Sequence, residues 1–171
     1  IAKYRPGIIG VTGSVGKTST KLAIAEVLRG ERNIRASSAN FNNEIGLPLT
    51  ILGSWTKISG ILFWPKVVCV SLWRLIFGSD YPEILILEYG VDRPGDMKYL
   101  LSVARPDISV VTAIGEIPVH VEFFSGPEEV AREKGRLVEC LPGQGFAVLN
   151  ADDTEVMEMK ERTRAHIMTF G

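Results

Sequence analysis

A lysine that follows two glycines in residues 10–20 could hold a phosphate group. The segment has the sequence GVTGSVGKTST. Gly13 and Gly16 let the backbone curl so that successive N–H groups point inward at phosphate oxygens, and a helix that follows adds the positive end of its dipole. Lys17 can reach the β- and γ-phosphates of a nucleoside triphosphate, and the Thr18 hydroxyl can bind Mg²⁺. We interpret the segment as a triphosphate-binding loop, with a glycine-rich turn and an incidental lysine as the less favoured alternative.

The loop departs from the general triphosphate-loop pattern at one position. That pattern has a glycine five residues before Gly16, where this chain has Val11. An apolar strand pattern before the loop and a helical pattern after it place Lys17 and Thr18 at the strand-to-helix junction that phosphate binding uses. The context therefore supports the interpretation despite the variant residue.

An acidic residue, Glu88, ends the apolar run ILIL of residues 84–87. A carboxylate at the carboxyl end of a buried strand, beside a phosphate loop, is suited to Mg²⁺, which prefers hard oxygen donors and bridges to phosphate oxygens. The structural alternative is a helix-capping or surface glutamate. Gly90 indicates a close approach to the backbone, and we interpret the nearby Asp92 and Asp96 as solvated or capping residues.

Two further side chains follow the third predicted strand. His120 lies in the segment after residues 107–112, and Lys134 lies on the helix predicted for residues 127–140. Taken alone, a loop histidine is weak evidence for a site, and a helical lysine is most often a solvated surface residue. Both nevertheless fall near the expected ligand end of the sheet, so their combination with the loop and Glu88 makes them candidate site residues.

Apolar runs typical of buried strands alternate along the chain with helical patterns. The strands are predicted at residues 7–12, 83–88, 107–112, 145–149 and 166–170, and the helices at 17–29, 95–103, 127–140 and 153–164. This alternation predicts an α/β fold of the P-loop NTPase-like type, with a mostly parallel sheet flanked by helices. Such sheets bind ligands at the carboxyl ends of their strands, where each candidate residue is expected.

The composition is that of one globular domain. The chain has 171 residues, of which 46% are hydrophobic and 23% charged, with a formal net charge of −1. These values exclude disorder of the whole chain and argue against a nucleic-acid partner, which would need surplus cations. Cys69 and Cys140 have no spacing typical of a disulfide scaffold or a metal site, so we expect two buried thiols in a reducing compartment.

Residues 58–77 form an apolar stretch of twenty residues, which is long enough to span a bilayer. A proline and two cations interrupt it, at Pro65, Lys66 and Arg74. Because a lysine or arginine at the centre of a bilayer costs roughly 2.5–3.5 kcal/mol, a spanning helix is not favoured.

The three tryptophans of the chain lie in or beside this stretch, at Trp55, Trp64 and Trp73. With the neighbouring cations they would suit a membrane interface. Tryptophans nine residues apart, however, lie on opposite faces of a helix. We therefore favour a helix that covers the core or docks on an absent domain, with membrane-surface contact through residues 55–77 as the alternative.

Five ordered features carry a resemblance to a known family. They are TGSVGKTST at residues 12–20, NFNNEIGLPLT at 40–50, EYGVDRPGD at 88–96, the 14-residue spacing from His120 to Lys134, and AVLNADD at 147–153. Together they resemble the central ATP-binding domain of the Mur ligase family, the amide-forming enzymes of peptidoglycan precursor synthesis. The family also has an apolar residue at the position of Val11, so this variation favours the resemblance.

The resemblance implies a role for each matching residue. Phosphate binding falls to the loop, at Thr12, Gly13, Ser14, Val15, Gly16, Lys17, Thr18 and Ser19. Thr18 and Glu88 would ligate a first Mg²⁺. His120 and Lys134 would build a second Mg²⁺ site, in which Lys134 is carbamylated by CO₂ because an ammonium would repel the metal whereas a carbamate supplies oxygen ligands.

The remaining implied roles are catalytic or concern the nucleotide and its surroundings. Lys17, His120 and Lys134 would be the catalytic residues. Cofactor-binding roles also extend to Asn43, which would line the substrate side of the loop, and to Asn150 and Asp152 on the nucleotide side.

The implied activity is ATP-dependent joining of a carboxylate to an amine. The γ-phosphoryl group of ATP is transferred to the carboxylate, the amine attacks the resulting acyl phosphate, and ADP and phosphate are released. Residues 40–50 and 88–96 resemble the subtype that adds D-alanyl-D-alanine to a UDP-N-acetylmuramoyl tripeptide. This implies a bacterial, cytoplasmic enzyme of cell-wall synthesis.

The resemblance also implies that residues 1–171 are the central domain of a longer enzyme. The family's N-terminal domain, which holds the UDP part of the substrate, and its C-terminal domain, which closes over ATP, do not appear in this sequence. We expect the domain alone to be inactive or weakly active. The alternatives are another ligase of the superfamily (folylpolyglutamate synthase-like or a Mur-like amidating enzyme), a P-loop switch or kinase-like module, and a binding module that has lost catalysis.

Overall fold

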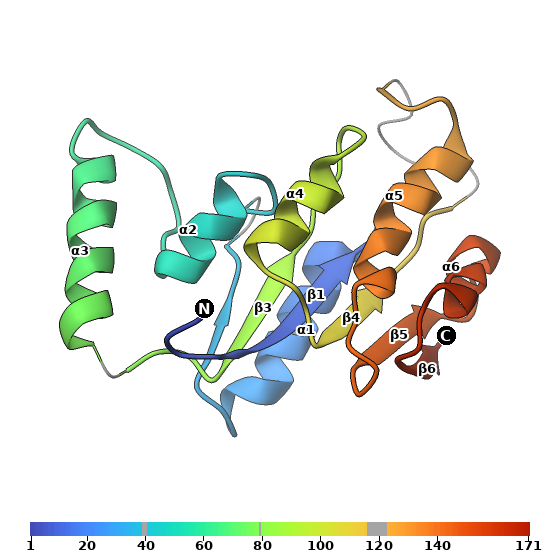
Figure 1. Ribbon diagram of the computed structural model, residues 1–171, viewed down its shortest axis with the longest axis horizontal. Coiled ribbons are helices and arrows are strands. Elements are labelled where there is room, and N and C mark those ends of the chain that lie inside the picture. Colours follow the sequence, from blue (N-terminus) through green and yellow to red (C-terminus); the bar gives the residue numbers. More distant parts are fainter. Residues whose placement is uncertain (39–40, 79, 116–122) are drawn as a thin grey trace.

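The computed structural model describes residues 1–38, 41–78, 80–115 and 123–171. Within these residues, six parallel strands form one sheet with helices on both faces (Figure 1). The strand order is β2-β3-β1-β4-β5-β6. The strands are β1 (Gly7–Thr12), β2 (Ile34–Ala36), β3 (Ile84–Glu88), β4 (Ile108–Val111), β5 (Phe146–Asn150) and β6 (His166–Phe170). The predicted α/β fold with a parallel sheet is confirmed.

The helices connect the strands in the manner of βαβ units. They are α1 (Lys17–Arg29), α2 (Gly46–Leu52), α3 (Phe63–Phe77), α4 (Asp96–Val103), α5 (Pro127–Glu139) and α6 (Thr154–Glu158), followed by the 3₁₀ helix η2 (Met159–Arg162). Pro127 occupies the first turn of α5, as predicted, with two acidic residues beside it that complement the helix dipole.

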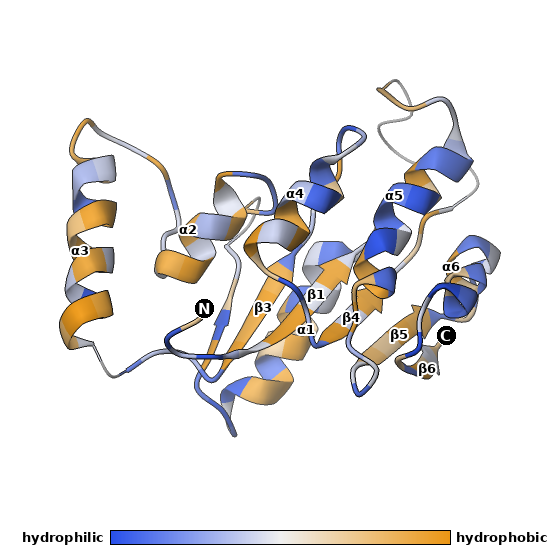
Figure 2. Cartoon of the chain, viewed as in Figure 1, coloured by the Kyte–Doolittle hydropathy of each residue, from blue (hydrophilic) through white to orange (hydrophobic). Residues whose placement is uncertain are grey.

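Alternation along the central strands supplies apolar side chains to both faces of the sheet, which appear as orange strands in Figure 2. One face carries Val11, Ile86 and Val110, which pack against Ala25 of α1. The opposite face packs against α2, α4, α5 and α6 through Ile8, Leu85, Leu87, Val111, Ala147 and Leu149. Burial on both faces explains why these strands have nearly continuous apolar sequences.

The strand β2 and the helix α2 were not predicted, and the last helix was predicted too long. β2 has only three residues, too few to show alternation. α2 begins with Gly46 and contains Pro48, which is tolerated because it lies in the first turn, where its missing N–H has no helical partner. The helix predicted for residues 153–164 is divided into α6 and η2, because the chain tightens into 3₁₀ geometry at the buried Met159.

α3 is a helix as predicted, but it does not cover the sheet. Figure 1 shows it standing apart at the left edge of the molecule. Only Phe63 and Val67 of this helix are buried, in a small cluster with Leu49. Cys69 lies on its uncovered side and is exposed, so the prediction of two buried thiols is wrong for Cys69, while Cys140 is half-buried. No helix among the described residues has the length and apolar character needed to cross a membrane.

β6 lies at one edge of the sheet. It pairs with β5 along its whole length, from His166 opposite Phe146 to Phe170 opposite Asn150. All five residues of β6 are exposed. Among the described strands, none pairs with its outer edge.

Candidate functional site

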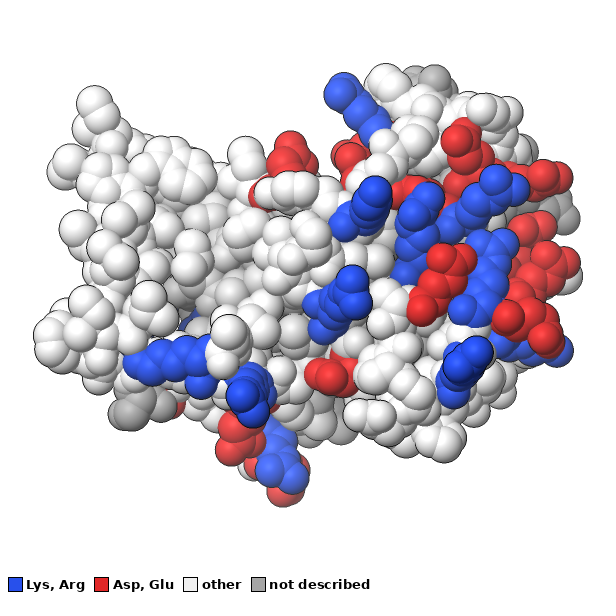
Figure 3. Space-filling view, viewed as in Figure 1, with Lys and Arg blue, Asp and Glu red and all other residues white. Residues whose placement is uncertain are grey.

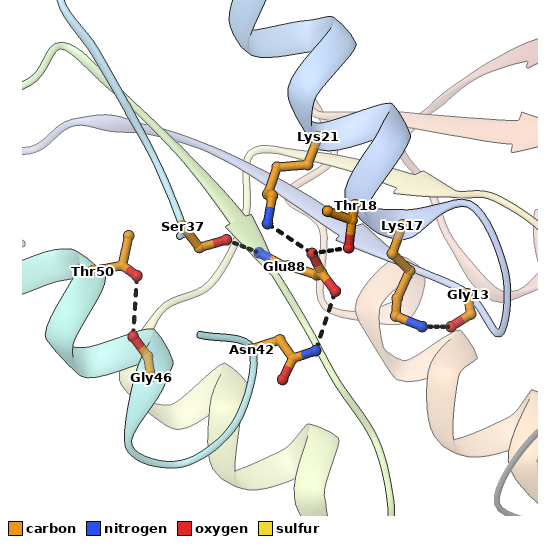
Figure 4. A network of polar contacts seen from close by, with 9 residues as sticks. All are labelled: Gly13, Lys17, Thr18, Lys21, Ser37, Asn42, Gly46, Thr50 and Glu88. Carbon is orange, nitrogen blue, oxygen red and sulfur yellow. Dashed lines mark hydrogen bonds and ion pairs between the residues drawn. The ribbon is translucent and has the colours of Figure 1, made fainter. Parts of the chain in front are cut away.

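The carboxyl ends of the parallel strands meet at one edge of the sheet, and the candidate loop extends from this edge. β1 ends at Thr12, β3 at Glu88 and β4 at Val111, and the register places Val11 beside both Glu88 and Val110. The loop of residues 13–16 then connects β1 to the start of α1 (Figure 4). The predicted strand–loop–helix arrangement is therefore present.

The loop adopts a conformation that requires glycine at two positions. Gly13 and Gly16 have φ angles of +144° and +85°. A Cβ atom at Gly13 would lie 2.0 Å from the Thr112 hydroxyl oxygen. The Ser14 N–H donates a hydrogen bond of 2.6 Å to the Ala113 carbonyl, so the segment after β4 holds the loop in place.

Lys17 curls back over this loop. Its Nζ donates hydrogen bonds to the carbonyl oxygens of Gly13 at 2.8 Å and Ser14 at 3.1 Å. Burial lowers the pKa of Lys17, while the nearby charges of Glu88 and Asp92 act in the opposite direction. The ammonium is thus held at the loop, where phosphate oxygens would be bound.

Glu88 is buried at the centre of a polar network (Figure 4). Its Oε2 accepts hydrogen bonds from the Thr18 hydroxyl at 3.1 Å and from Lys21 Nζ at 2.9 Å. Its Oε1 accepts a bond of 3.1 Å from Asn42 Nδ2. Because Lys21 is also fully buried, the two charges compensate one another in a region without solvent.

Three members of this network were missed by the sequence interpretation. Lys21, Asn42 and Ser37 were not identified, although the Ser37 hydroxyl accepts a bond of 3.3 Å from the Glu88 N–H. Lys21 lies one turn after Lys17, so helical spacing could have placed it on the same side of α1. Ser37 follows β2, the strand that was not predicted.

The close approach predicted at Gly90 is present. A Cβ atom there would lie 2.8 Å from the side-chain amide carbon of Asn42. The Gly90 N–H also donates a bond of 2.7 Å to the Asn42 carbonyl oxygen. Gly90 therefore allows the segment before α2 to reach Glu88.

Lys134 reaches the phosphate loop from α5. Its side chain is 3% exposed, and its Nζ donates a hydrogen bond of 2.8 Å to the Ser14 hydroxyl. Burial and the charge of Lys17 lower the pKa of Lys134 to about 8, against the opposite influence of Asp92. It is therefore not the solvated helical lysine that its sequence context alone would favour.

The neighbouring Glu133 ties α5 to α4. Its Oε1 accepts hydrogen bonds from the backbone N–H groups of Gly95 at 2.9 Å and Met97 at 3.1 Å, at the start of α4. The carboxylate thereby satisfies donors at a helix N-terminus, which would otherwise lack partners. This contact fixes the turn of α5 that carries Lys134.

Comparison with known proteins identifies the family. The Mur ligase middle domain family matches residues 11–58 and 74–171. The chain belongs to the Mur ligase family.

Similar Mur ligases are found among curated proteins and solved structures. The chain is 35% identical over 161 residues to the UDP-N-acetylmuramoyl-tripeptide–D-alanyl-D-alanine ligase of Mycobacterium leprae, covering 94% of this chain and 26% of that protein. It is 32% identical over 165 residues to the ligase of the same name from a Synechocystis strain, covering 96% and 31%. The MurF ligase of Thermotoga maritima in complex with ADP matches with a TM-score of 0.77 and 29% identity, covering 99% of this chain and 34% of that one. The chain thus spans about a quarter to a third of these relatives.

The remaining candidate residues, Asn43, Asn150, Asp152 and His120, do not all lie at the phosphate loop. Asn43 Oδ1 accepts a bond of 2.9 Å from the Gly46 N–H at the start of α2, so its side chain supports that helix. Asn150 and Asp152 lie at the carboxyl end of β5, two strands from β1, where Asn150 Oδ1 accepts a bond of 3.0 Å from the Asp152 N–H. His120 lies outside the described residues.

A further carboxylate of this Mur ligase domain, Asp153, was predicted as the start of a helix and as the last residue of the AVLNADD segment. Its side chain caps α6 by accepting from the Val156 N–H, and it also accepts from Ile114 at 2.8 Å and Gly115 at 3.0 Å. Burial alone would raise the pKa of Asp153, but these N–H donors outweigh it and lower the pKa. Asp153 therefore anchors the backbone that follows β4.

Lys134→Met is expected to change how the stability of the domain depends on pH. Because burial lowers the pKa of Lys134 from 10.5 to about 8, the unfolded chain binds more protons between these values, and wild-type stability rises with pH across that window. Methionine removes this contribution. In CO₂-free buffer, the unfolding free energy of wild type minus that of the variant should increase by about 2 kcal/mol when the pH is raised from about 7.5 to about 9.5. Urea denaturation measures both chains, and a constant difference would show that Lys134 is not desolvated.

Proposed function

We propose that the chain is the ATP-binding middle domain of a UDP-N-acetylmuramoyl-tripeptide–D-alanyl-D-alanine ligase. The observation that carries this proposal is the contact between Lys134 of α5 and Ser14 of the phosphate loop. A nucleotide switch or kinase-like module has no use for a second buried lysine at this point of the loop. The substrates are proposed from the relatives, which carry this ligase name.

The loop residues are suited to the phosphates of ATP. Lys17 would exchange its bonds to the Gly13 and Ser14 carbonyl oxygens for bonds to phosphate oxygens, and the curled backbone would supply N–H donors. Thr18 and Glu88 fit a magnesium ion, because their oxygens already lie 3.1 Å apart and Mg²⁺ takes one or two protein ligands together with phosphates. When bound, the ion neutralises charge on the transferring phosphoryl group.

Lys134 is proposed to carry the carbamate. The reaction requires the neutral amine, which attacks CO₂ and loses a proton to give a carbamate. Burial of Lys134 and the pKa of about 8 both favour the neutral amine. With His120, the carbamate would hold a second Mg²⁺. Support for this assignment is the contact to Ser14 and the spacing of the two residues in the sequence.

The proposed reaction has two steps. An oxygen of the tripeptide's terminal carboxylate attacks the γ-phosphorus of ATP, and the bond to ADP breaks to leave an acyl phosphate. The amine of D-alanyl-D-alanine then attacks the acyl carbon, phosphate leaves, and the amine loses a proton. Catalysis of the first step depends mostly on position and charge, which Lys17 and the buried Glu88 network supply.

A hollow beside the loop is proposed to accept the substrate carboxylate and the amine. It has a volume of about 690 Å³ and is lined in part by Asn43, Gly90, Arg93 and Phe123. The guanidinium of Arg93 lies over the Phe123 ring, 5.2 Å from its centroid. Arg93 is the cation among the lining residues, beside the acidic Glu44, Asp92 and Asp96, and it would contact the substrate carboxylate.

The proposal includes the setting of the domain. Residues 1–171 would act with flanking domains that bind the UDP group and close over ATP, in the bacterial cytoplasm, and the domain alone would have little activity. Support comes from the share of the relatives that the chain covers, 26% and 31% in the two ligases above. The formal net charge of −1 remains unfavourable for a nucleic-acid partner.

The full-length protein provides the test. Supplied with ATP, Mg²⁺, UDP-N-acetylmuramoyl tripeptide and D-alanyl-D-alanine, it is expected to release ADP and form the amide product only when both substrates are present. ADP and product are measured by chromatography. Equal ADP release without either substrate would contradict the ligase proposal. Product formed from glutamate or ammonia, but not from D-alanyl-D-alanine, would instead favour a folylpolyglutamate synthase-like or amidating enzyme.

A further inference from the structure

The uncovered side of α3 and the turn before it form an apolar surface on this protein. Its residues, here called the α3 surface, are Ile61, Leu62, Trp64, Val68, Leu72, Trp73, Leu75, Ile76 and Phe77. Their exposed fractions range from 49% at Trp64 to 93% at Ile61. A helix that is apolar on all sides is normally buried, and large exposed apolar patches mark interaction sites.

Most of the α3 surface lies outside the part of the chain that matches the family. The Mur ligase match covers residues 11–58 and 74–171 and omits residues 59–73, which hold most of this surface. A partner shared by all Mur ligases is therefore not expected to cover it. The surface is a feature of this chain, and it needs its own explanation.

The charged residues of α3 and of the segment before it are all positive. Between Glu44 and Asp80 the sequence contains no acidic residue, but it contains Lys57, Lys66 and Arg74. The N-terminal segment adds a fourth cation, because Lys3 Nζ donates to the Leu75 carbonyl oxygen near the end of α3. On the face shown in Figure 3, no acidic side chain lies over α3. An apolar surface bordered mainly by cations, with Asp80 just beyond the C-terminal end of α3, is complementary to anionic lipid headgroups.

The two helical tryptophans occupy the positions that a half-immersed helix requires. Phe63 and Val67 face the protein, and Leu72 and Ile76 lie on the opposite side of α3. At about 100° per residue, Trp64 and Trp73 fall about a quarter-turn to either side of that outer line. Both rings would therefore sit at the level of the headgroups, where tryptophan is enriched. In the sequence, the placement of these tryptophans on opposite faces of the helix argued against contact with a membrane interface. Because α3 does not cover the sheet, the same placement now supports such contact.

A groove beside the helix adds depth to this surface. It has a volume of about 880 Å³ and lies between the segment of residues 54–62 and the first half of α3, with Lys57 and Lys66 among its lining residues. Lysine side chains can extend from such an apolar wall to place their ammonium groups at headgroup level.

We propose that the α3 surface binds the interface of an anionic lipid bilayer, with α3 parallel to the membrane plane. The helix has 15 residues and a length of about 22 Å, which is shorter than the ~30 Å hydrocarbon core, so it lies in the interface. The apolar outer line enters the acyl region, and Lys57 and Lys66 beside the groove contact the headgroups. This proposal is independent of the ligase proposal, because it involves none of the residues at the phosphate loop.

Flotation with vesicles tests the proposal on the full-length protein and on the 171-residue chain. Both are expected to float with phosphatidylglycerol-containing vesicles, to bind phosphatidylcholine vesicles more weakly, and to lose part of the binding in high salt. The double variant Leu72→Glu/Ile76→Glu should lower partitioning at least about tenfold, because it places two charges in the acyl region. Lys66→Gln should lower it roughly fivefold.

A matched control and a depth measurement complete the test. Leu22→Glu/Val27→Glu changes two exposed apolar residues of α1 and should leave binding unchanged. In a Trp55→Phe background, brominated lipids should quench Trp64 and Trp73 to a similar extent. Thermal melting should show that each variant remains folded, because the side chains replaced by glutamate or glutamine are exposed and phenylalanine keeps most of the apolar contacts of the half-buried Trp55.

Three outcomes would overturn the proposal. The first is no binding by either protein, or binding that Leu72→Glu/Ile76→Glu does not weaken. The second is binding by the 171-residue chain but not by the full-length protein, which would show that flanking segments cover α3. The third is a dimer in analytical ultracentrifugation that Leu72→Glu/Ile76→Glu dissociates, without vesicle binding, which would make a second copy the occupant.

Discussion

Lys134→Ala is expected to lower the proposed ligase activity of the full-length protein by about 10³-fold, the scale of losing one preorganised group that stabilises charge in the transition state. The physical reason is that Lys134 is buried against Ser14 of the phosphate loop, where a carbamate would contribute oxygen ligands. Short-chain carboxylates such as acetate should enter the space left by the side chain and restore part of the activity. The rate of amide formation measures both effects.

The control is Lys98→Ala, which removes an exposed lysine from α4 and should leave the rate unchanged. Nucleotide binding, followed with a fluorescent ATP analogue, should be weakened far less by Lys134→Ala than by Lys17→Ala, because Lys17 is the residue proposed to contact phosphate directly. Full activity of the Lys134→Ala protein, or a loss that no carboxylate restores, would count against the carbamate.

Glu88→Ala is expected to destabilise the domain by about 3–5 kcal/mol. The substitution removes the carboxylate that forms an ion pair with the fully buried Lys21, and the loss of this buried ion pair costs far more than the loss of the side-chain atoms. The double variant Glu88→Ala/Lys21→Met should recover most of the loss, because it removes both charges. Urea denaturation of the 171-residue chain gives the three unfolding free energies.

The same variants separate stability from nucleotide binding. Glu88→Ala/Lys21→Met should fold but bind ATP with little dependence on Mg²⁺, since the oxygen donor beside Thr18 is absent. Glu83→Ala serves as the matched control: its carboxylate forms an exposed ion pair of 3.7 Å with Arg32, and its loss should cost less than about 1 kcal/mol. If Glu88→Ala did not lower the unfolding free energy, the charges of Glu88 and Lys21 would not compensate one another in the folded protein.

The sequence predicted the structure best at positions where the local backbone conformation or the local hydrophobic pattern restricts which residue can be present. Gly13 and Gly16 could be identified because the loop's positive φ angles favour glycine, and Glu88 because a polar residue at the end of an apolar strand is unusual. The parallel sheet followed from nearly continuous apolar strands, which burial on both faces produces. These signals lie within a few residues of one another and need no knowledge of distant contacts.

The parts that could not be predicted depend on contacts between distant segments. A buried lysine such as Lys21 has the same local sequence context as a solvated one, and only its partner on β3 distinguishes them. Asn42 reaches Glu88 from another segment, 46 residues away. The sequence around α3 predicted a helix, but which of its sides would remain uncovered depended on the position of the sheet.

The outer edge of β6, with which no strand of the described residues pairs, has a consequence for the isolated domain. A strand with unpaired N–H and C=O groups along one side is a template on which another extended chain can add, and edge-to-edge association of this kind leads to aggregation. The exposed residues of β6 include Ile167, Met168 and Phe170, which would reinforce such stacking. Concentrated samples of the 171 residues should therefore self-associate through β6 more readily than a longer chain in which this edge is capped.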